Sequence, residues 1–375
     1  MATACRRLRG FFITNSKIPH NFSKLQSLVK RFKKRSESAY FRSRRDVYSL
    51  TVERLSKSKS YSMIEEIIEH QKKFEDITNE SFTGHLISLY GKAGMAEHAR
   101  NLFDEMPQLN CPRTVYSFNI LLSSYIHAGK SEMVIDLAQD LQEKLGVTLD
   151  LISYNNVLKA LCEMGDLGFA FSLLDEMDSK GLEPSLVTYN TLLNGFYVNK
   201  RFADGEKIWG IMQSKNIVPD VRSYNSRLRG LVSRKGVKKA VELLEEMTSK
   251  GIKPNVISYN AVIRGFCDEG NIDEAKRWYA KLKEDFSMPD VVTYVTLVPF
   301  LCKEGDFDMA CELSTEIANR GLIVRAALVQ PVVNGLVKQS KLAEAKHLIE
   351  LWNSSRPSSY KLTSPAKLFS LNFIL

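Results

Sequence analysis

Residues 186–212 read LVTYNTLLNGFYVNKRFADGEKIWGIM, and this stretch decides the fold because similar strings recur along the chain. Strings with the same Ser/Thr-Tyr-Asn opening begin near residues 151, 221 and 256, so successive starts are 35 residues apart. A fixed period of this length is the signature of a repeat protein. Extending the frame outward gives nine units: 45–79, 80–114, 115–150, 151–185, 186–220, 221–255, 256–290, 291–325 and 326–360.

Each unit carries the pattern of two helices. In the unit 186–220, apolar residues at three- and four-residue steps predict a helix over 187–198. A second apolar face predicts a helix over 202–214, and Pro219 closes the unit where a helix cannot continue. Since one hairpin cannot bury both of its apolar faces, neighbouring hairpins must stack. The chain is therefore predicted to be an all-α solenoid, a superhelix of about nine helix-turn-helix repeats.

Two columns of small residues support the hairpin. The turn between the helices usually holds a glycine, as a helix C-cap with positive φ prefers: Gly94, Gly129, Gly165, Gly270 and Gly305. A small residue recurs in the second helix, where it allows close approach of the first: Ala99, Ala170, Gly205, Ala240, Ala275, Ala310 and Ala345. Both columns predict structural roles.

The positive charge of the chain is concentrated at its start. The formal net charge is +9, but residues 1–45 hold 13 Lys or Arg and the single acid Glu37, which leaves −3 for residues 46–375. Overall basicity is therefore no argument for nucleic-acid binding by the repeats. Any such function must rest on local features.

The first 44 residues have the composition of an organellar transit peptide, rich in Arg and Ser and poor in acids. Apolar residues share one face of an expected helix whose other faces are basic: Phe22, Leu25, Leu28, Val29 and Phe32. We predict that residues 1–44 are a cleavable transit peptide that directs import into the mitochondrion, with the chloroplast as the alternative. A basic RNA-contacting arm is the rival interpretation of the same segment.

Several site classes lack their residue patterns. The six cysteines form no CxxC pair and have no His at zinc-ligand spacing, and Cys162, Cys267 and Cys302 occupy one position of different repeats, so packing explains them. No deaminase motif or acid cluster of a metal nuclease is present. No apolar run approaches the roughly 20 residues that span a bilayer. We expect no catalysis, cofactor, metal or membrane span.

The period, the Ser/Thr-Tyr-Asn opening, the Ala of the second helix and endings such as Gly-Ile-Lys-Pro at 251–254 resemble pentatricopeptide repeats. The resemblance covers residues 45–360 and is most specific in the five middle units. Tetratricopeptide repeats fit less well, because their period is about 34 and their Trp and Gly-Tyr signature is absent. The resemblance implies a right-handed α-solenoid of the P class from a plant organelle, which binds single-stranded RNA.

The same resemblance implies that each repeat faces one base, and that the fifth and last residues of the unit set the base preference. Carried over to this sequence, the pairs are Asn119 with Asp150, Asn155 with Ser185, Asn190 with Asp220, Asn225 with Asn255, and Asn260 with Asp290. The family's code reads them as U, C, U, C or U, and U. We therefore expect a short pyrimidine-rich single strand such as UCUCU or UCUUU. The flanking pairs, Gly84 with Thr114 and Val295 with Arg325, fit no usual base.

Alternatives remain for these residues. Asp, Ser and Asn before a helix are good N-caps, and the Ser or Thr two residues before each Asn caps as well. The Asn column is harder to explain as structure, because Asn has a mediocre helix propensity, and we expect exposed positions whose replacement leaves folding intact.

The functional alternative is a scaffold in the mitochondrial ribosome or another organellar ribonucleoprotein, with mitochondrial ribosomal proteins as partners. The chain is expected to be a monomer. The tail 361–375 falls outside the repeat pattern, and docking on the last hairpin is the expectation for it.

Overall fold

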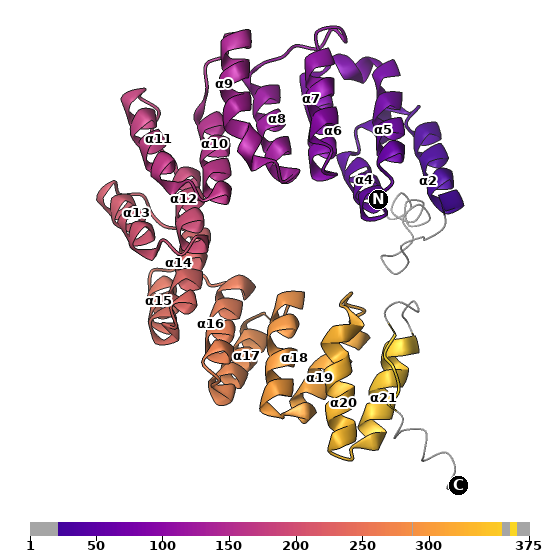
Figure 1. Ribbon diagram of the computed structural model, residues 1–375, viewed down its shortest axis with the longest axis vertical. Helices are drawn as coiled ribbons and strands as arrows, with labels where there is room; N and C mark the ends of the chain where they lie inside the picture. The colour runs from indigo at the N-terminus through magenta and orange to yellow at the C-terminus, as the bar shows by residue number, and fades with distance from the viewer. Residues whose placement is uncertain (1–21, 287, 355–360, 366–375) are drawn as a thin grey trace. The chain divides into compact units, whose positions relative to one another are not determined.

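The computed structural model describes residues 22–286, 288–354 and 361–365 (Figure 1). Throughout this part of the chain the regular structure is helical, without a strand, which confirms the predicted all-α class. The chain divides at Ile217–Val218 into two compact units. We call them the N-unit, up to Ile217, and the C-unit, from Val218, and describe each by itself.

The described part of the N-unit, residues 22–217, contains fifteen helical segments, of which three are short 3-10 helices. They are α2 Phe22–Arg35, α3 Ala39–Arg42, α4 Arg45–Lys57, α5 Tyr61–Glu69, η1 His70–Lys73, η2 Glu75–Thr78, α6 Glu80–Lys92, α7 Ala96–Glu105, α8 Val115–His127, η3 Ser131–Met133, α9 Val134–Leu145, α10 Leu151–Met164, α11 Leu167–Ser179, α12 Leu186–Val198 and α13 Phe202–Ser214. The described C-unit contains α14 Val221–Ser233, α15 Val237–Ser249, α16 Val256–Asp268, α17 Ile272–Phe286, α18 Val291–Glu304, α19 Phe307–Asn319, α20 Ala326–Lys338 and α21 Leu342–Ser354.

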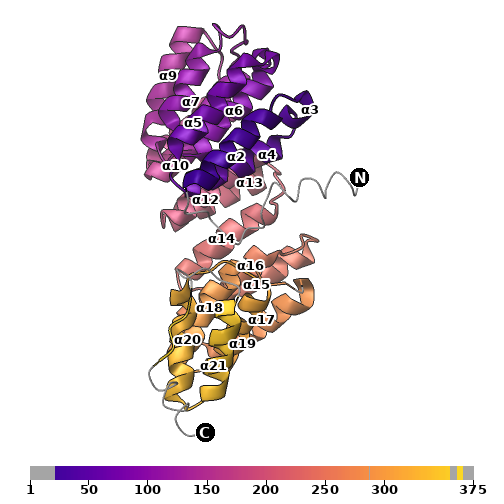
Figure 2. The ribbon, with the colours of Figure 1, turned by 90° about the vertical axis from the view of Figure 1, so that its right-hand side faces the viewer.

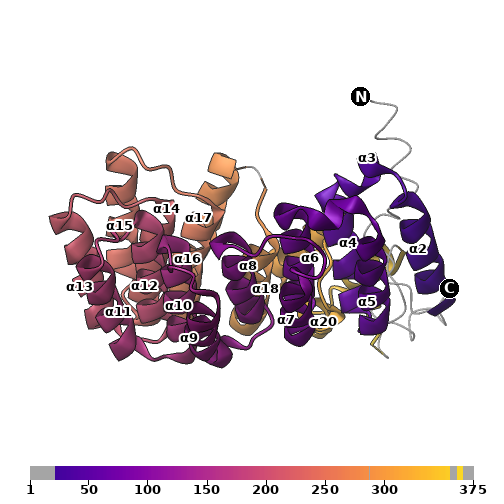
Figure 3. The ribbon, with the colours of Figure 1, turned by 90° about the horizontal axis from the view of Figure 1, so that it is seen from above.

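Each of the nine predicted units is a hairpin of a first helix, the A helix, and a second, the B helix. Consecutive A helices pack on each other, with α6, α8, α10 and α12 in sequence in the N-unit (Figure 3). In the C-unit the same holds for α14, α16, α18 and α20 (Figure 2). The 35-residue hairpin repeat is therefore confirmed. The superhelical course of the full array stays a prediction.

The turn of every hairpin contains one residue in the left-handed conformation. The five predicted glycines have φ between 72° and 82°, as the C-cap interpretation requires. In the other four units the same place is held by Lys59, Lys200, Lys235 and Ser340, with φ between 53° and 62°. The turn geometry is thus a property of the repeat, which glycine makes easier but does not alone determine.

Close packing between neighbouring A helices also depends on small residues. A Cβ on Gly195 of α12 would lie 2.2 Å from Sγ of Cys162 on α10, and a Cβ on Gly91 of α6 would lie 2.5 Å from Ser124 on α8. The small residues of the B helices are fully buried, as predicted; Ala170, Ala240 and Ala310 are examples, each 0% exposed. These contacts bring successive A helices to a fixed separation.

A buried aromatic residue precedes the Asn in each middle A helix: Phe118, Tyr154, Tyr189, Tyr224 and Tyr259. Tyr154 is 2% exposed, donates a hydrogen bond to Glu176 at 2.9 Å and accepts one from Lys180 at 2.8 Å, both at the end of α11. Tyr224 repeats the contact with Glu246 at 3.4 Å. These hydrogen bonds hold the first helix of the hairpin against the end of its second helix.

Residues 22–44 fold against the first hairpin of the array. The predicted apolar face of α2 is buried within the fold, which the transit-peptide interpretation did not predict; Leu25, Leu28, Val29 and Phe32 are all at or below 4% exposure. The ring of Phe32 lies 5.2 Å from that of Phe41 and 4.9 Å from that of Tyr48. The transit-peptide boundary at residue 44 stays a prediction, while residues 1–21 lie outside the described residues.

At the other end, the described part of the tail continues the pattern of the repeat. The backbone N–H and the hydroxyl of Thr363 donate to Gln330 at 2.9 and 3.0 Å, and Leu362 exchanges hydrogen bonds with Asn353. Residues 361–365 therefore dock on the last hairpin, as expected; residues 366–375 lie outside the described residues. Among the described helices, none has the length and apolar character to cross a membrane.

Candidate nucleic-acid interface

Three of the five predicted Asn side chains are buried and link consecutive hairpins. Their exposed fractions are 6% for Asn119, 3% for Asn225 and 7% for Asn260. In each case the amide nitrogen donates to the last residue of the same unit, and the amide oxygen accepts from the hydroxyl of the third residue of the next unit. We call this arrangement the Asn bridge.

The bridge at Asn119 shows the geometry. Its Nδ2 donates to Oδ1 of Asp150 at 2.9 Å, and Oγ of Ser153 donates to Oδ1 of Asn119 at 2.7 Å. Asp150 is also the N-cap of α10, since its Oδ1 accepts from the Ser153 backbone N–H at 2.8 Å. Burial raises the pKa of Asp150, but hydrogen bonds from Ser153 and Asn119 outweigh burial and hold that pKa below its ordinary value. The carboxylate is therefore ionised at neutral pH.

The C-unit contains the same bridge twice. Nδ2 of Asn225 donates to Oδ1 of Asn255 at 3.2 Å, and Nδ2 of Asn260 donates to Oδ1 of Asp290 at 2.9 Å. The hydroxyl donors each lie 2.7 Å from the Asn amide oxygen, Ser258 at Asn225 and Thr293 at Asn260. Asn, like Asp, therefore serves as the last residue of a bridge.

Asn155 departs from this pattern because the last residue of its unit is Ser185. Thr188, the equivalent hydroxyl, instead accepts from the Ser185 backbone N–H at 3.1 Å and lies 3.3 Å from the Ser185 hydroxyl. Oδ1 of Asn155 is buried without a hydrogen-bond partner among the described residues. A buried acceptor without a partner costs free energy, so this oxygen favours a donor supplied by a ligand.

In the remaining pair, Asn190 belongs to the N-unit and Asp220 to the C-unit. Asn190 is half-buried on α12. Asp220 is the N-cap of α14, where its Oδ1 accepts from the backbone N–H groups of Arg222 and Ser223 at 2.9 and 3.0 Å. Asp220 therefore has the capping role of Asp150.

These positions settle two expectations about the site. The N-cap interpretation is confirmed, because all five last residues are N-caps: Asp150, Ser185, Asp220, Asn255 and Asp290. The expectation of exposed Asn positions without a structural role is wrong for Asn119, Asn225 and Asn260, because their amides join hairpins. The recurring Ser or Thr two residues before each Asn was the sequence signal for this bridge. Base contact by the pairs stays a prediction.

Some last residues keep one polar atom outside the bridge. The hydrogen bonds described for the side chains of Asp150 and Asp290 all use Oδ1, so Oδ2 is left as an acceptor. The hydrogen bonds described for the Asn255 side chain use its Oδ1, so its Nδ2 is left as a donor. All three residues are partly exposed. A ligand at this edge therefore meets an acceptor in some units and a donor in another.

An exposed apolar side chain lies three residues before the Asn position in the first turn of most A helices. We call these residues the apolar row: Tyr116, Ile152 and Val187 in the N-unit, and Ile257 and Val292 in the C-unit, with exposed fractions of 46% to 58%. Arg222 takes the place in the unit 221–255. An exposed apolar group therefore recurs at one register position of successive hairpins, where it is accessible to a ligand. Sequence reasoning missed this row, although the apolar second residue was visible in four of the five middle units.

The flanking units lack the Asn bridge. The side chain of Ile120 lies 2.6 Å from the place where a Cβ on Gly84 would be, and the Thr114 hydroxyl is bound to Glu80 at 2.8 Å. Val295 is 49% exposed and Arg325 is also exposed. The arrangement therefore belongs to the middle of the repeat array, as the sequence predicts.

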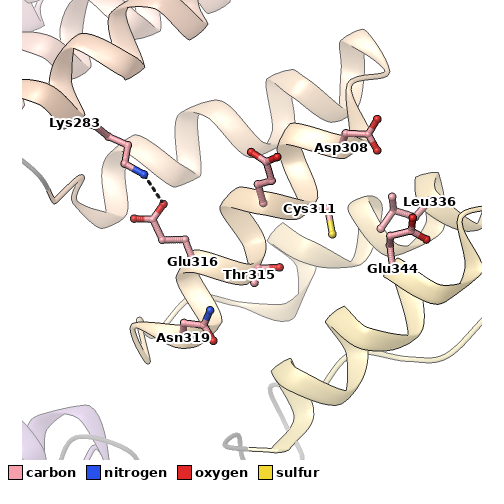
Figure 4. Close-up of a pocket in the computed structure, with 9 residues that line it drawn as sticks. Lys283, Asp308, Cys311, Thr315, Glu316, Asn319, Leu336 and Glu344 are labelled. Atoms are coloured by element: carbon pink, nitrogen blue, oxygen red, sulfur yellow. Dashed lines mark ion pairs between the residues drawn. The ribbon is translucent and has the colours of Figure 1, made fainter.

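A separate pocket of about 720 Å³ lies in the C-unit between α19 and its neighbours (Figure 4). Its lining includes Asp308, Glu312, Glu316 and Glu344, while Lys283 pairs with Glu316 at 3.6 Å. Four carboxylates against one ammonium repel a phosphate chain, so the pocket is unsuited to nucleic acid. No group of three or more metal-ligating side chains occurs in the part of the chain that the structure describes.

The predicted packing role of the repeated cysteines agrees with their surroundings. Cys162, Cys267 and Cys302 are free thiols that are buried or half-buried. Burial raises the pKa of Cys162 and Cys267 to about 12 and that of Cys302 to about 11. The thiols are therefore protonated and poorly nucleophilic at neutral pH.

Comparison with known proteins gives consistent matches to one family. Its repeat model, described as the PPR repeat family, matches residues 81–127, 149–198, 184–233, 219–268 and 254–303, and a PPR repeat model matches 116–144. Together these matches cover more than half of the chain. A maize protein of known crystal structure, the pentatricopeptide repeat protein PPR10, aligns with 94% of this chain and 56% of its own at 19% identity and a TM-score of 0.49.

Three relatives from Arabidopsis thaliana show how much sequence is shared. The small ribosomal subunit protein mS78 is 48% identical over 155 residues, 41% of this chain and 39% of its own. The small ribosomal subunit protein mS79 is 40% identical over 156 residues, 42% and 40% of the two chains. A pentatricopeptide repeat-containing protein named as mitochondrial is 39% identical over 142 residues, 38% and 34% of the two. The chain spans less than half the length of these relatives, and by its repeats it belongs to the pentatricopeptide repeat family.

Proposed function

We propose that this protein binds single-stranded RNA along the first turns of its A helices, with one base per hairpin. The proposal rests on two features that recur at the same register position of successive hairpins. One is an exposed side chain of the apolar row, and the other is a polar atom of the last residue of the unit. Unstacked bases are recognised by contact with their faces and by hydrogen bonds to their edges. The apolar row serves the faces, and the last residues serve the edges.

The bridge gives a physical basis for the expected base preference. The free Oδ2 of an ionised Asp accepts from the N3–H of uracil, a donor that cytosine lacks. The free Nδ2 of Asn255 donates to the N3 acceptor of cytosine. Asn155, with its unpaired Oδ1, favours the exocyclic amine of cytosine. In this proposal the Asn side chains mainly hold the last residues in place, and UCUCU is the preferred short site.

A second candidate function is membership of a ribosomal ribonucleoprotein. Two relatives that share 40% and 48% identity with part of this chain are named small ribosomal subunit proteins, which favours this role. In both candidates the protein binds RNA without catalysing a reaction and acts in the mitochondrion, as the name of a further relative suggests. The protein partners in the second case are ribosomal proteins.

The apolar row provides the test of RNA binding. In the full chain, Ile152→Ser, Val187→Ser and Ile257→Ser together are expected to weaken binding to a UCUCU-containing RNA at least tenfold, since three apolar contacts with base faces are lost and each buried CH₂ group contributes about 0.8 kcal/mol. The control is Val198→Ser, Val218→Ser and Ile323→Ser, three residues that are 57–76% exposed and lie outside the row. Equal affinity of the two triple variants would overturn the proposal.

Sedimentation separates the two candidates. Treatment of a mitochondrial lysate with nuclease and high salt leaves the ribosomal subunits intact. The same treatment destroys complexes between free proteins and messenger RNA. Cosedimentation of the protein with a subunit would support the ribosomal role. Its release to the top of the gradient would support free RNA binding.

A further inference from the structure

The exposed face of α2 is strongly basic. Residues 22–44 contain eight Lys and Arg against the single acid Glu37. Lys24, Lys30 and Lys34 are exposed, and Arg31 and Arg35 lie on the same side of the helix. Lys24 and Lys34 are separated by about 15 Å along the axis, at 1.5 Å per residue.

The nearby acids are engaged by other cations. Glu66 pairs with Lys33 at 2.9 Å, and Glu37 pairs with Lys73 at 2.6 Å. Further along the segment, Arg42 pairs with Asp76 and Arg44 with Asp46, each at 2.7 Å. Within the described residues, no ion pair involves Lys24, Lys30 or Lys34. Their positive charge is therefore available to a partner.

The buried face of α2 decides which polyanion fits. An amphipathic helix binds a membrane by inserting its apolar face among the lipids. In α2 that face is used within the fold, where Val29 is 2% and Phe32 is 0% exposed. Over residues 23–35, whose side chains are described, the helix presents a row of cations to solvent without an apolar group to insert. Such a surface suits the phosphates of a nucleic acid.

We propose that the exposed face of α2 is a second RNA-binding surface, which contacts backbone phosphates irrespective of sequence. The proposal rests on the RNA binding proposed above and adds affinity without base preference. It also requires that α2 is retained in the working protein, so that any import cleavage occurs before residue 22. The packing of Phe32 and the ion pair between Lys33 and Glu66 attach α2 to the folded array, which favours its retention in the mature protein.

The salt dependence of binding tests this surface. The full chain with Lys24→Gln, Lys30→Gln and Lys34→Gln is titrated with a 30-nucleotide oligo(A) over a range of KCl concentrations. Each lost phosphate contact lowers the slope of log K against log salt by about 0.7 for single strands, so the expected loss is about 2. The ratio of affinities for UCUCU and purine RNA is expected to stay unchanged, which separates this surface from the base-reading edge.

Three exposed lysines of the C-unit provide a control with the same change in charge: Lys238→Gln, Lys338→Gln and Lys346→Gln. This variant is expected to keep the parental slope. Equal slopes for the two triple variants would overturn the proposal. So would a loss of binding to phosphatidylserine vesicles with unchanged oligo(A) binding, because the surface would then face a membrane. Finding that the protein isolated from the organelle begins after residue 35 would also overturn it.

Discussion

Among single residues, the Asn of the middle repeats combines a polar side chain with deep burial. Asn225 is 3% exposed, and its amide is bonded at both ends, to Asn255 and to Ser258. The Asn225 amide therefore links its own hairpin to the next one. Its two partner side chains are oriented by the backbones that carry them. Asn119, Asn225 and Asn260 are therefore explained by stability, and base contact by the Asn column stays a prediction.

Asn225→Ala is expected to lower the free energy of unfolding by about 1–3 kcal/mol, because it leaves buried polar partners without their hydrogen bonds. Urea denaturation followed by circular dichroism measures the change. The control is Asn319→Ala, at an exposed Asn that also lies in the C-unit. For this variant a change within about 0.5 kcal/mol is expected. Equal effects of the two substitutions would show that the Asn bridge does not stabilise the fold.

The cysteine column makes a chemical prediction. Because burial raises the pKa of Cys162 and Cys267 to about 12, iodoacetamide at pH 8 is expected to label them far more slowly in the folded protein than in urea. Mass spectrometry of peptides after timed labelling measures both rates. Labelling of the folded protein as fast as the unfolded one would contradict the packing role.

At the scale of helices, the separation of successive A helices depends on which side chains they lack. Gly195→Ala is expected to destabilise the protein by about 1–3 kcal/mol, because its Cβ would overlap Cys162 on the neighbouring helix. Gly210→Ala on α13 is the control, since no atom lies within 4 Å of its Cβ position. There the better helix propensity of Ala is expected to add up to about 1 kcal/mol of stability. A stabilising Gly195→Ala would contradict the observed contact.

The first described helix, α2, allows a test of whether residues 22–44 belong to the folded array. Phe32→Ala in the full chain is expected to cost about 3–5 kcal/mol, because Phe32 is 0% exposed and stacks edge-on with Phe41 and Tyr48. Thermal denaturation measures the loss. Tyr40→Ala, at a residue that is 67% exposed, is expected to change little. A silent Phe32→Ala would mean that this segment is a leader without a place in the fold.

For the whole molecule, the sequence predicted the fold far better than the site. The period, the hairpin and the caps follow from local patterns, and the helix predicted over 202–214 is observed as Phe202–Ser214. The Asn bridge was not predicted, because it joins residues 30 to 34 positions apart whose distance depends on how hairpins stack. The apolar row was missed for a similar reason, since the exposure of Ile152 depends on how its helix packs against the neighbouring helices. The composition of the basic segment also gave no sign that residues 22–35 pack as α2 within the fold.

The base preference of the full protein tests one-base-per-hairpin recognition most directly. Asn255 demonstrates that Asn can cap and bridge in place of Asp, so Asp150→Asn with Asp290→Asn is expected to keep the fold. Competition between single strands containing UCUCU and CCUCC is measured for both proteins. We predict that the parent prefers UCUCU and that the double variant prefers CCUCC, with a change of about 5- to 150-fold for each position. An unchanged preference in a folded double variant would contradict base reading by the last residue of each repeat.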